Sequence, residues 1–179
     1  RLTRAVVKQV DSKIWNVVTE DQTPTNINSL TASGAWNTGN AADPIGDIME
    51  AKRLIWEDNY NPEGADLWIS PKGHEYLLTW LINTKGSSIP SFSSEKLKSG
   101  VVMEILGLNV RVSNNVTATS GAAVVIIPKA ACTWKSFTDT TSVAIEDQGI
   151  GTTFRVYELG IPILHDPQAV CYIGSVEIA

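Results

Sequence analysis

The stretch from Asp66 to Ile82 constrains the fold of this 179-residue chain more than any other, because it predicts a buried strand that leads directly into a helix. Leu67 to Ile69 form a short, uninterrupted apolar run, which is typical of a strand covered on both faces. Ser70 then supplies the hydroxyl of a helix N-cap. Pro71 takes the first helical position, where its missing N–H would have no partner in any case. The sequence therefore predicts a central strand that other elements must cover.

The helix that starts at Pro71 has apolar side chains three or four residues apart, as a core-facing helix does. These side chains belong to Tyr76, Leu77, Trp80 and Leu81. Strands elsewhere in the chain must supply the rest of the core. The residues that we expect to be buried together are Trp68, Ile69, Leu77, Trp80, Leu81, Val110, Val125 and Val170.

Two further helices are predicted, and the chain between them is polar. Leu2 to about Thr19 has an apolar stripe of Leu2, Val6, Val10, Ile14 and Val17, with Lys13 as the one charge on its flank. Residues 21–43 are rich in Thr, Asn and Gly, so we expect an irregular connection there. Asp43 and Pro44 then repeat the cap and proline start of a helix that ends near Asp58. Its predicted core stripe is Ile45, Ile48, Met49, Ala51, Ile55 and Trp56.

The second half of the chain predicts short strands. Two are bent at Gly107, and a later pair forms a hairpin across residues 147–151. With the helices they indicate an α+β protein. The expected strands are residues 67–69, 101–106, 108–112, 122–127, 143–145, 152–158 and 169–173, with a loop at residues 83–100.

Composition excludes some functions. The net charge of −5 argues against a dedicated nucleic-acid-binding domain, since such domains usually carry a basic excess. No apolar run approaches the length of a membrane span, so we expect no membrane partner. Cys132 and Cys171 each stand in apolar surroundings, which favours buried thiols over a disulfide.

Groups that could carry catalysis do not cluster. His74 and His165 lie far apart, and neither has a partner at metal-ligand spacing. The thiols lack a histidine signature, and the glycines near Gly151 lack the strand and helix context of a phosphate loop. We therefore expect no enzymatic activity, no catalytic residues, no cofactor and no metal.

Four stretches, taken in order, resemble the major capsid proteins of tailed bacterial and archaeal viruses with the HK97-type fold, which encapsulin shells share. Leu2 to Thr19 is similar to the spine helix of that family, and Asp66-Leu-Trp-Ile-Ser-Pro with its helix resembles a segment of the axial domain. Gly107-Leu-Asn-Val-Arg-Val-Ser-Asn resembles a strand turn, with Asn109 where proline is usual. Residues 158–170 resemble the end segment, with His165 and Asp166 replacing the usual basic residue before proline.

The resemblance implies an architecture and a function. It implies a peripheral domain (residues 1–43 and 138–164) with a spine helix and a long β-hairpin. It also implies an axial domain (residues 44–137 and 165–179) with a central mixed sheet flanked by helices. The family pattern places an N-terminal arm and an extended E-loop before the spine helix, and the sequence, which starts at Arg1, does not include them.

The function implied is a structural major capsid protein. Its copies would assemble into pentamers and hexamers of an icosahedral shell that encloses double-stranded DNA, in a virion assembled in the host cytoplasm. One alternative is an encapsulin-like compartment that encloses protein cargo. A second alternative is a small α+β enzyme, which would need a convergent polar pocket.

The first helix also suggests one candidate binding surface. Arg1, Arg4 and Lys8 lie within about 60° of one another, opposite the apolar stripe. In the family that this chain resembles, the spine helix runs along the inner surface of the shell, so this basic side would face packaged DNA. The alternatives are a solvated face or ion pairs between subunits, with acidic loops such as that of Glu63.

Overall fold

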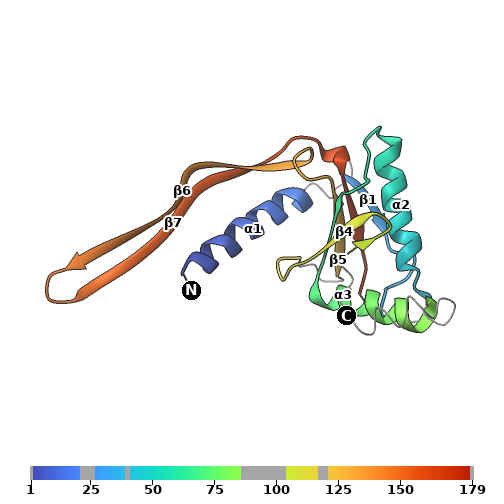
Figure 1. Ribbon diagram of the computed structural model, residues 1–179, viewed down its shortest axis with the longest axis horizontal. Helices are drawn as coiled ribbons and strands as arrows, with labels where there is room; N and C mark the ends of the chain where they lie inside the picture. Colours follow the sequence, from blue (N-terminus) through green and yellow to red (C-terminus); the bar gives the residue numbers. More distant parts are fainter. Residues whose placement is uncertain (1, 21–26, 39–40, 86–103, 117–120, 178–179) are drawn as a thin grey trace.

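The computed structural model describes residues 2–20, 27–38, 41–85, 104–116 and 121–177. These residues form a compact lobe from which a long arm extends (Figure 1). The arm consists of helix α1 (Leu2–Glu20) and the hairpin of strands β6 (Cys132–Asp147) and β7 (Gly151–Leu164). Residues 101–103 of the predicted strand at 101–106 and residues 86–100 of the predicted loop at 83–100 lie outside the described residues, as does Arg1.

The lobe is built on a mixed six-stranded sheet with the order β1-β8-β5-β2-β4-β3. β2 lies inside this sheet, parallel to β4 and antiparallel to β5, which confirms that the predicted strand is central. The strands are β1 (Asn28–Thr31), β2 (Asp66–Ile69), β3 (Glu104–Ile105), β4 (Leu108–Val112), β5 (Ala122–Ile126) and β8 (Val170–Gly174).

Helix α3 (Pro71–Trp80) starts as the sequence predicts. The Ser70 hydroxyl accepts a hydrogen bond from the Gly73 N–H at 2.8 Å, so the cap satisfies one of the free donors of the first turn. Leu77 and Trp80 are buried, and the Trp80 indole N–H donates to the carbonyl of Ala42 at 2.9 Å. A π-helical segment, Leu81–Lys85, continues α3, so the prediction of a loop at residues 83–100 is wrong for residues 83–85.

Helix α2 (Pro44–Glu57) also begins at its predicted cap, where the Asp43 carboxylate accepts from the Gly46 N–H at 3.2 Å. On its buried side, Asp47 accepts hydrogen bonds from the Ser33 N–H and the Trp36 indole N–H, both at 2.9 Å. These two bonds hold the segment after β1 against α2.

The core has two parts, one on each face of the sheet. Val125 packs with Leu77 and Trp80 on the face that α2 and α3 cover, whereas Val124 packs on the opposite face. Alternate residues of a strand point to opposite faces, which explains the division.

The predicted single core is therefore wrong for two members. Trp68 and Val170 belong to the second part of the core, with Trp15 and Val18 of α1. Trp68 and Val110 are also only half-buried. Trp68 belongs to the second part because it lies between Leu67 and Ile69 in β2, and alternate residues of a strand point to opposite faces.

The prediction of an irregular segment at residues 21–43 is wrong for β1. This strand pairs in parallel with β8, in the register Asn28 to Cys171. Its partner lies about 140 residues away in sequence, and four residues, Asn-Ser-Leu-Thr, carry no periodic pattern that would reveal the pairing.

Two elements cross the boundaries predicted for the domains. β1 lies in the segment assigned to the peripheral domain and pairs within the sheet of the lobe. β6 begins at Cys132, before the predicted start of the peripheral segment at residue 138. The division into peripheral and axial domains at the stated residues stays a prediction.

We predict that Leu77→Ala lowers the free energy of unfolding by about 2 to 5 kcal/mol, because it leaves a cavity in the core between α3 and the sheet. Chemical denaturation measures this loss. Glu75→Ala, on the exposed side of the same helix, should change it by less than about 0.5 kcal/mol. Equal effects of both variants would contradict the packing of α3.

Candidate assembly surfaces

The hairpin of the arm is a two-stranded ribbon that leaves the lobe. β6 and β7 pair with each other in antiparallel register, from Cys132 opposite Leu164 to Asp147 opposite Gly151. Among the described residues, no third strand joins either edge. A two-stranded ribbon is marginally stable alone in water, and its free edges are ready to pair or to be covered.

The ribbon bends where its register shifts. The shifts lie between Ser136 and Thr138 and between Thr138 and Thr141, and each places an extra residue in β6. Such bulges bend a ribbon and increase its twist. Figure 1 shows the bend in the part of the hairpin that lies beside α1.

Trp134 fixes the base of the hairpin. Its indole lies over Gly160, where a Cβ atom would collide with the ring, and its N–H donates to Glu158 Oε1 at 2.8 Å. The second carboxylate oxygen of Glu158 accepts from the Thr140 hydroxyl at 2.8 Å. The Glu158 carboxylate therefore links Trp134, which precedes both bulges of β6, to Thr140, which lies within the second bulge.

Helix α1 lies along one face of this hairpin. Val6 and Val10 line a groove of about 420 Å³ together with Trp134 and Val156, so part of the predicted apolar stripe faces the hairpin. Lys13 lines the same groove. The stripe is incompletely covered, because Leu2 at its start remains 51% exposed.

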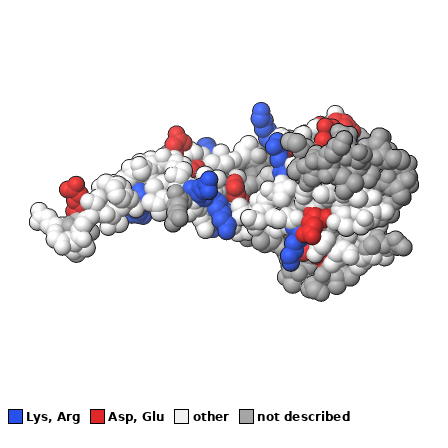
Figure 2. All heavy atoms as spheres, turned by 60° about the horizontal axis from the view of Figure 1, so that its bottom comes forward, with Lys and Arg blue, Asp and Glu red and all other residues white. Residues whose placement is uncertain are grey.

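The opposite face of the hairpin carries exposed apolar side chains. The Trp134 ring packs on Gly160 beside the groove, so strand alternation places Leu159 and Ile161, the neighbours of Gly160 in β7, on the other face. Phe137, in the first bulge, is 70% exposed, Leu159 56% and Ile161 48%. We call these three residues the outer patch of the arm. Figure 2, which brings the α1 side of the molecule forward, shows basic and acidic side chains at intervals along the arm, with uncharged surface between them.

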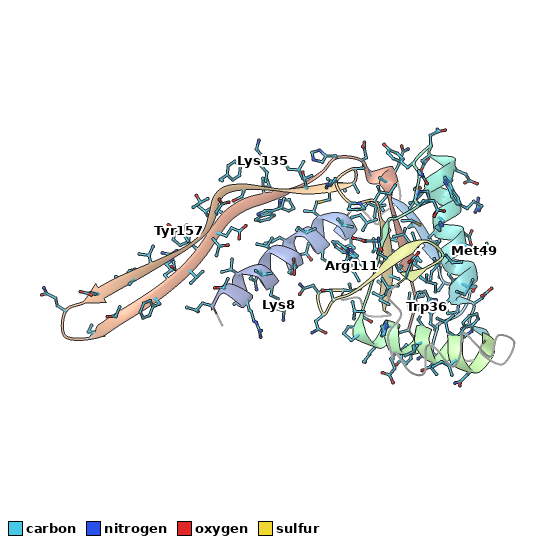
Figure 3. The ribbon with its side chains drawn as sticks, viewed as in Figure 1. Lys8, Trp36, Met49, Arg111, Lys135 and Tyr157 are labelled. Atoms are coloured by element: carbon cyan, nitrogen blue, oxygen red, sulfur yellow. The ribbon has the colours of Figure 1, made fainter. Side chains whose placement is uncertain are left out.

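The predicted basic side of α1 faces away from the hairpin. Figure 3 shows Lys8 pointing to the side of α1 opposite the ribbon. Arg4 and Lys8 are exposed and line a hollow of about 330 Å³ with Val7 and Asp11 of α1 and with residues 112–115 at the end of β4. We call this hollow the notch. Arg1, the third predicted cation, lies outside the described residues.

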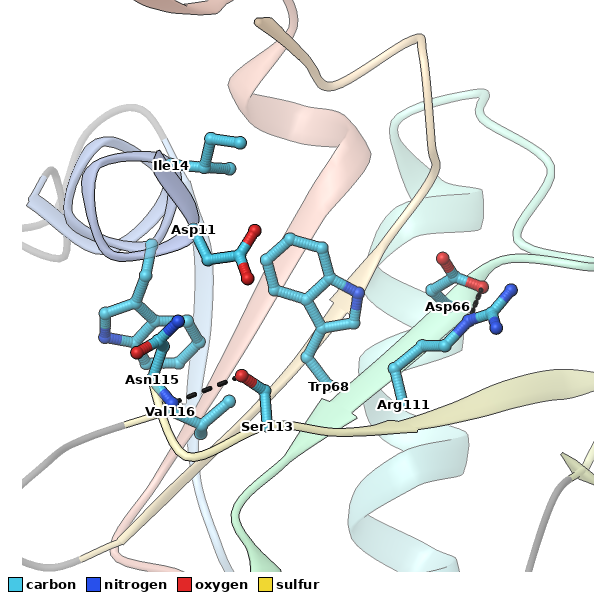
Figure 4. Close-up of a pocket in the computed structure, with 9 residues that line it drawn as sticks. Asp11, Ile14, Asp66, Trp68, Arg111, Ser113, Asn115 and Val116 are labelled. Carbon is cyan, nitrogen blue, oxygen red and sulfur yellow. Dashed lines mark hydrogen bonds and ion pairs between the residues drawn. The ribbon is translucent and has the colours of Figure 1, made fainter. Parts of the chain in front are cut away.

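The notch continues into a pocket of about 290 Å³ between α1 and the sheet, and the two share Asp11, Ser113 and Asn115 (Figure 4). Trp68 forms the wall of this pocket, which explains why it is only half-buried. Desolvation raises the pKa of Asp11 above its ordinary value. Opposite Trp68, Arg111 Nε lies 3.4 Å from Asp66 Oδ1.

A third surface lies on α2. Its exposed stripe consists of Met49, Glu50, Arg53, Trp56 and Glu57, which we call the α2 ridge. The prediction that Met49 and Trp56 face the core is wrong, since they are 57% and 49% exposed. Successive residues of a helix are about 100° apart, so Met49 and Trp56 lie roughly a quarter turn around α2 from the buried Ile48 and Ile55. This angle could have predicted their exposure from the sequence.

Lys52, under the ridge, is 6% exposed. Its ammonium donates to Glu63 Oε1 at 2.8 Å and to the Leu106 carbonyl at 2.7 Å, and lies 5.1 Å from the centroid of the Trp56 ring. A buried charge is stable only when it is paired in this way, so the network fixes Trp56 on the surface.

The groups considered for catalysis stay apart. His74 lies in the first turn of α3, where burial lowers its pKa, and His165 forms a 2.7 Å hydrogen bond with the Thr133 hydroxyl. Both cysteines are free, and burial raises the pKa of Cys171 to about 12. Within the described ranges, no group of three or more potential metal ligands occurs, and no helix is long and apolar enough to cross a membrane.

The fold defines a class of protein. The architecture of the lobe and arm is similar to that of Mycobacterium phage Che8 (TM-score 0.74, 19% identity, 98% of this chain and 61% of that chain). It is also similar to the capsid of cyanophage P-SCSP1u (TM-score 0.70, 13% identity, 94% and 62%). The SrpI encapsulin of Synechococcus elongatus is similar as well (TM-score 0.57, 11% identity, 98% and 63%). The chain thus has the HK97-type fold, as the sequence predicts, and spans less than two thirds of the length of these proteins.

Residues 1–173 match the model of the phage capsid protein family, and the chain belongs to that family. This membership confirms the expected family, and it supports the capsid interpretation better than the encapsulin one. No curated protein matches the chain.

We predict that Gly160→Ala destabilises the arm by about 1 to 3 kcal/mol, because the added methyl group forces the Trp134 ring from its site. Near-ultraviolet circular dichroism and thermal unfolding measure the change. Thr153→Ala, at an exposed position of the same strand, serves as the control. An unaltered tryptophan signal in the Gly160 variant would contradict the packing of the ring on this glycine.

Proposed function

We propose that the full-length protein is the shell subunit of a virion and that its copies assemble into pentamers and hexamers of an icosahedral capsid. The shell encloses double-stranded DNA and is assembled in the host cytoplasm. The role of the subunit is mechanical, with no enzymatic step. Membership of the phage capsid family supports this proposal.

The observation that carries it is the arm. Its outer patch exposes three large apolar side chains on a ribbon with two free edges among the described residues. Exposed apolar surface of this kind marks an interaction site, and the remainder of the described chain does not cover it. Neighbouring copies of the same subunit would cover it in a closed shell.

The encapsulin alternative shares this reasoning and differs in what the shell contains. An encapsulin of Synechococcus elongatus has a similar fold. Measuring the ratio of absorbance at 260 and 280 nm of purified particles separates the two alternatives, since DNA and protein cargo differ there. The third alternative, a small enzyme, would give a full-length protein that stays monomeric at high concentration.

Contact between packaged DNA and Arg1, Arg4 and Lys8 stays a prediction. Phosphate contacts by lysine and arginine need no base-specific partner, and salt weakens them. The described members of this set line the notch, whose alternative use is considered in the next section.

We predict that Phe137→Ser, Leu159→Ser and Ile161→Ser together raise the concentration needed for assembly roughly 100-fold. Each substitution removes on the order of 1 kcal/mol of apolar burial between copies. Sedimentation velocity and electron microscopy of the full-length protein measure assembly. Because the three side chains are exposed within one copy, thermal unfolding of the isolated subunit should barely change.

A matched control carries Lys72→Ser and Glu75→Ser on the exposed side of α3 and should assemble as the parent does. Normal assembly of the arm variant would contradict a role of the outer patch in shell contacts.

A further inference from the structure

The α2 ridge has the character of a contact surface. Arg53 pairs with Glu50 at 3.1 Å and with Glu57 one turn away, so the charges along the ridge are ordered. Met49 and Trp56 stand beside them, half exposed. Lys52 holds the Trp56 ring from below, which limits the side-chain entropy that binding would cost. Rigid tryptophans of this kind dominate many protein interfaces.

The notch has the complementary character. It combines two exposed valines, Val7 at 49% and Val112 at 48%, with the cations Arg4 and Lys8. Asn115 joins its two walls, because its side-chain amide donates to the Lys8 carbonyl at 3.4 Å. The pocket beside Trp68 deepens the notch and offers an apolar wall to a bulky side chain (Figure 4).

The charges of the two surfaces are opposite. The notch carries two cations and the carboxylate of Asp11, whereas the ridge carries the carboxylates of Glu50 and Glu57 and one guanidinium, that of Arg53. Each surface also exposes two large apolar side chains. Complementary charge around an apolar centre is the usual pattern of a specific interface.

The two surfaces lie on different sides of the molecule, so one copy cannot join its own ridge to its own notch. In Figure 3, Met49 points outward from the lobe on the side away from α1, while Lys8 lies beneath the arm. Contacts between two different surfaces of identical copies are heterologous, and such contacts build rings when the rotation closes. A ring-forming subunit needs one such pair.

We propose that the α2 ridge of one copy packs into the notch of the next copy in a ring, with Trp56 against the apolar wall and Glu50 and Glu57 facing Arg4 and Lys8. The partner is thus a second copy of this chain. This inference rests on the proposed function and names a contact within it. The competing occupant of the notch is packaged DNA.

Charge reversal in the full-length protein tests the pairing. Arg4→Glu with Lys8→Glu, and separately Glu50→Lys with Glu57→Lys, should each raise the concentration needed for assembly about tenfold or more, because like charges then meet. All four substitutions in one chain should restore assembly to within about threefold of the parent. Native mass spectrometry of the rings and sedimentation of the shells provide the readout.

The outcomes separate the alternatives. Rescue by the four substitutions supports the contact, because ridge and notch do not meet within one copy. Failure of rescue, with subunits that unfold as the parent does, overturns it. If Arg4→Glu with Lys8→Glu leaves empty shells normal and weakens only DNA-filled particles, the notch faces the genome and the inference is wrong. If the parent itself forms no shells, the proposed function has failed first.

A cysteine pair gives an independent measurement. Val7→Cys with Trp56→Cys should form disulfide-linked ladders in assembled particles under mild oxidation, since both side chains are exposed. Val7→Cys with Thr153→Cys, at an exposed position of β7, is the matched control and should not form ladders. Linkage in the control at the same rate, or none in the test pair, contradicts the proposed contact.

Discussion

The structure depends on the burial of both faces of the six-stranded sheet. One face is covered by α2 and α3, and the other receives Trp15 and Val18 from the end of α1. Because β5 contributes alternate residues to both faces, a single strand joins the two parts of the core. The attachment of the arm to the lobe follows from this arrangement, since the same helix that closes the second face continues outward along the hairpin.

Beyond this attachment the arm has little core of its own. The hairpin keeps its shape through local devices: its bulges, the Trp134 ring over Gly160, and the carboxylate of Glu158. These contacts define a bent ribbon and leave the outer patch uncovered. A stable lobe with an incompletely covered arm is the arrangement expected of a subunit that completes its packing with neighbours. In the proposed contact, the ridge on the lobe and the notch between α1 and the end of β4 are two further surfaces that neighbouring copies would cover.

Much of the lobe could be predicted because its signals are local. The caps at Asp43 and Ser70 and the apolar run of β2 are each readable within a few residues. Patterning predicted the hairpin only near its tip, although the threonine-rich residues 138–142 favour strand, whereas the resemblance implied a long hairpin. β1 could not be predicted, since its pairing with β8 joins distant segments. The resemblance to capsid proteins supplied the class of protein, and patterning alone did not.

The sequence by itself determined where the helices begin, which strand is central and which helix faces carry apolar stripes. These properties depend on backbone propensity and on side chains a few residues apart. Only the tertiary structure decided which apolar side chains stay exposed. Leu159 and Ile161 stay exposed because no described segment covers the face of the hairpin opposite α1, and Trp68 is half-buried because α1 leaves a pocket over it. Whether a side chain is covered depends on what distant segments bring to it, which local sequence does not encode.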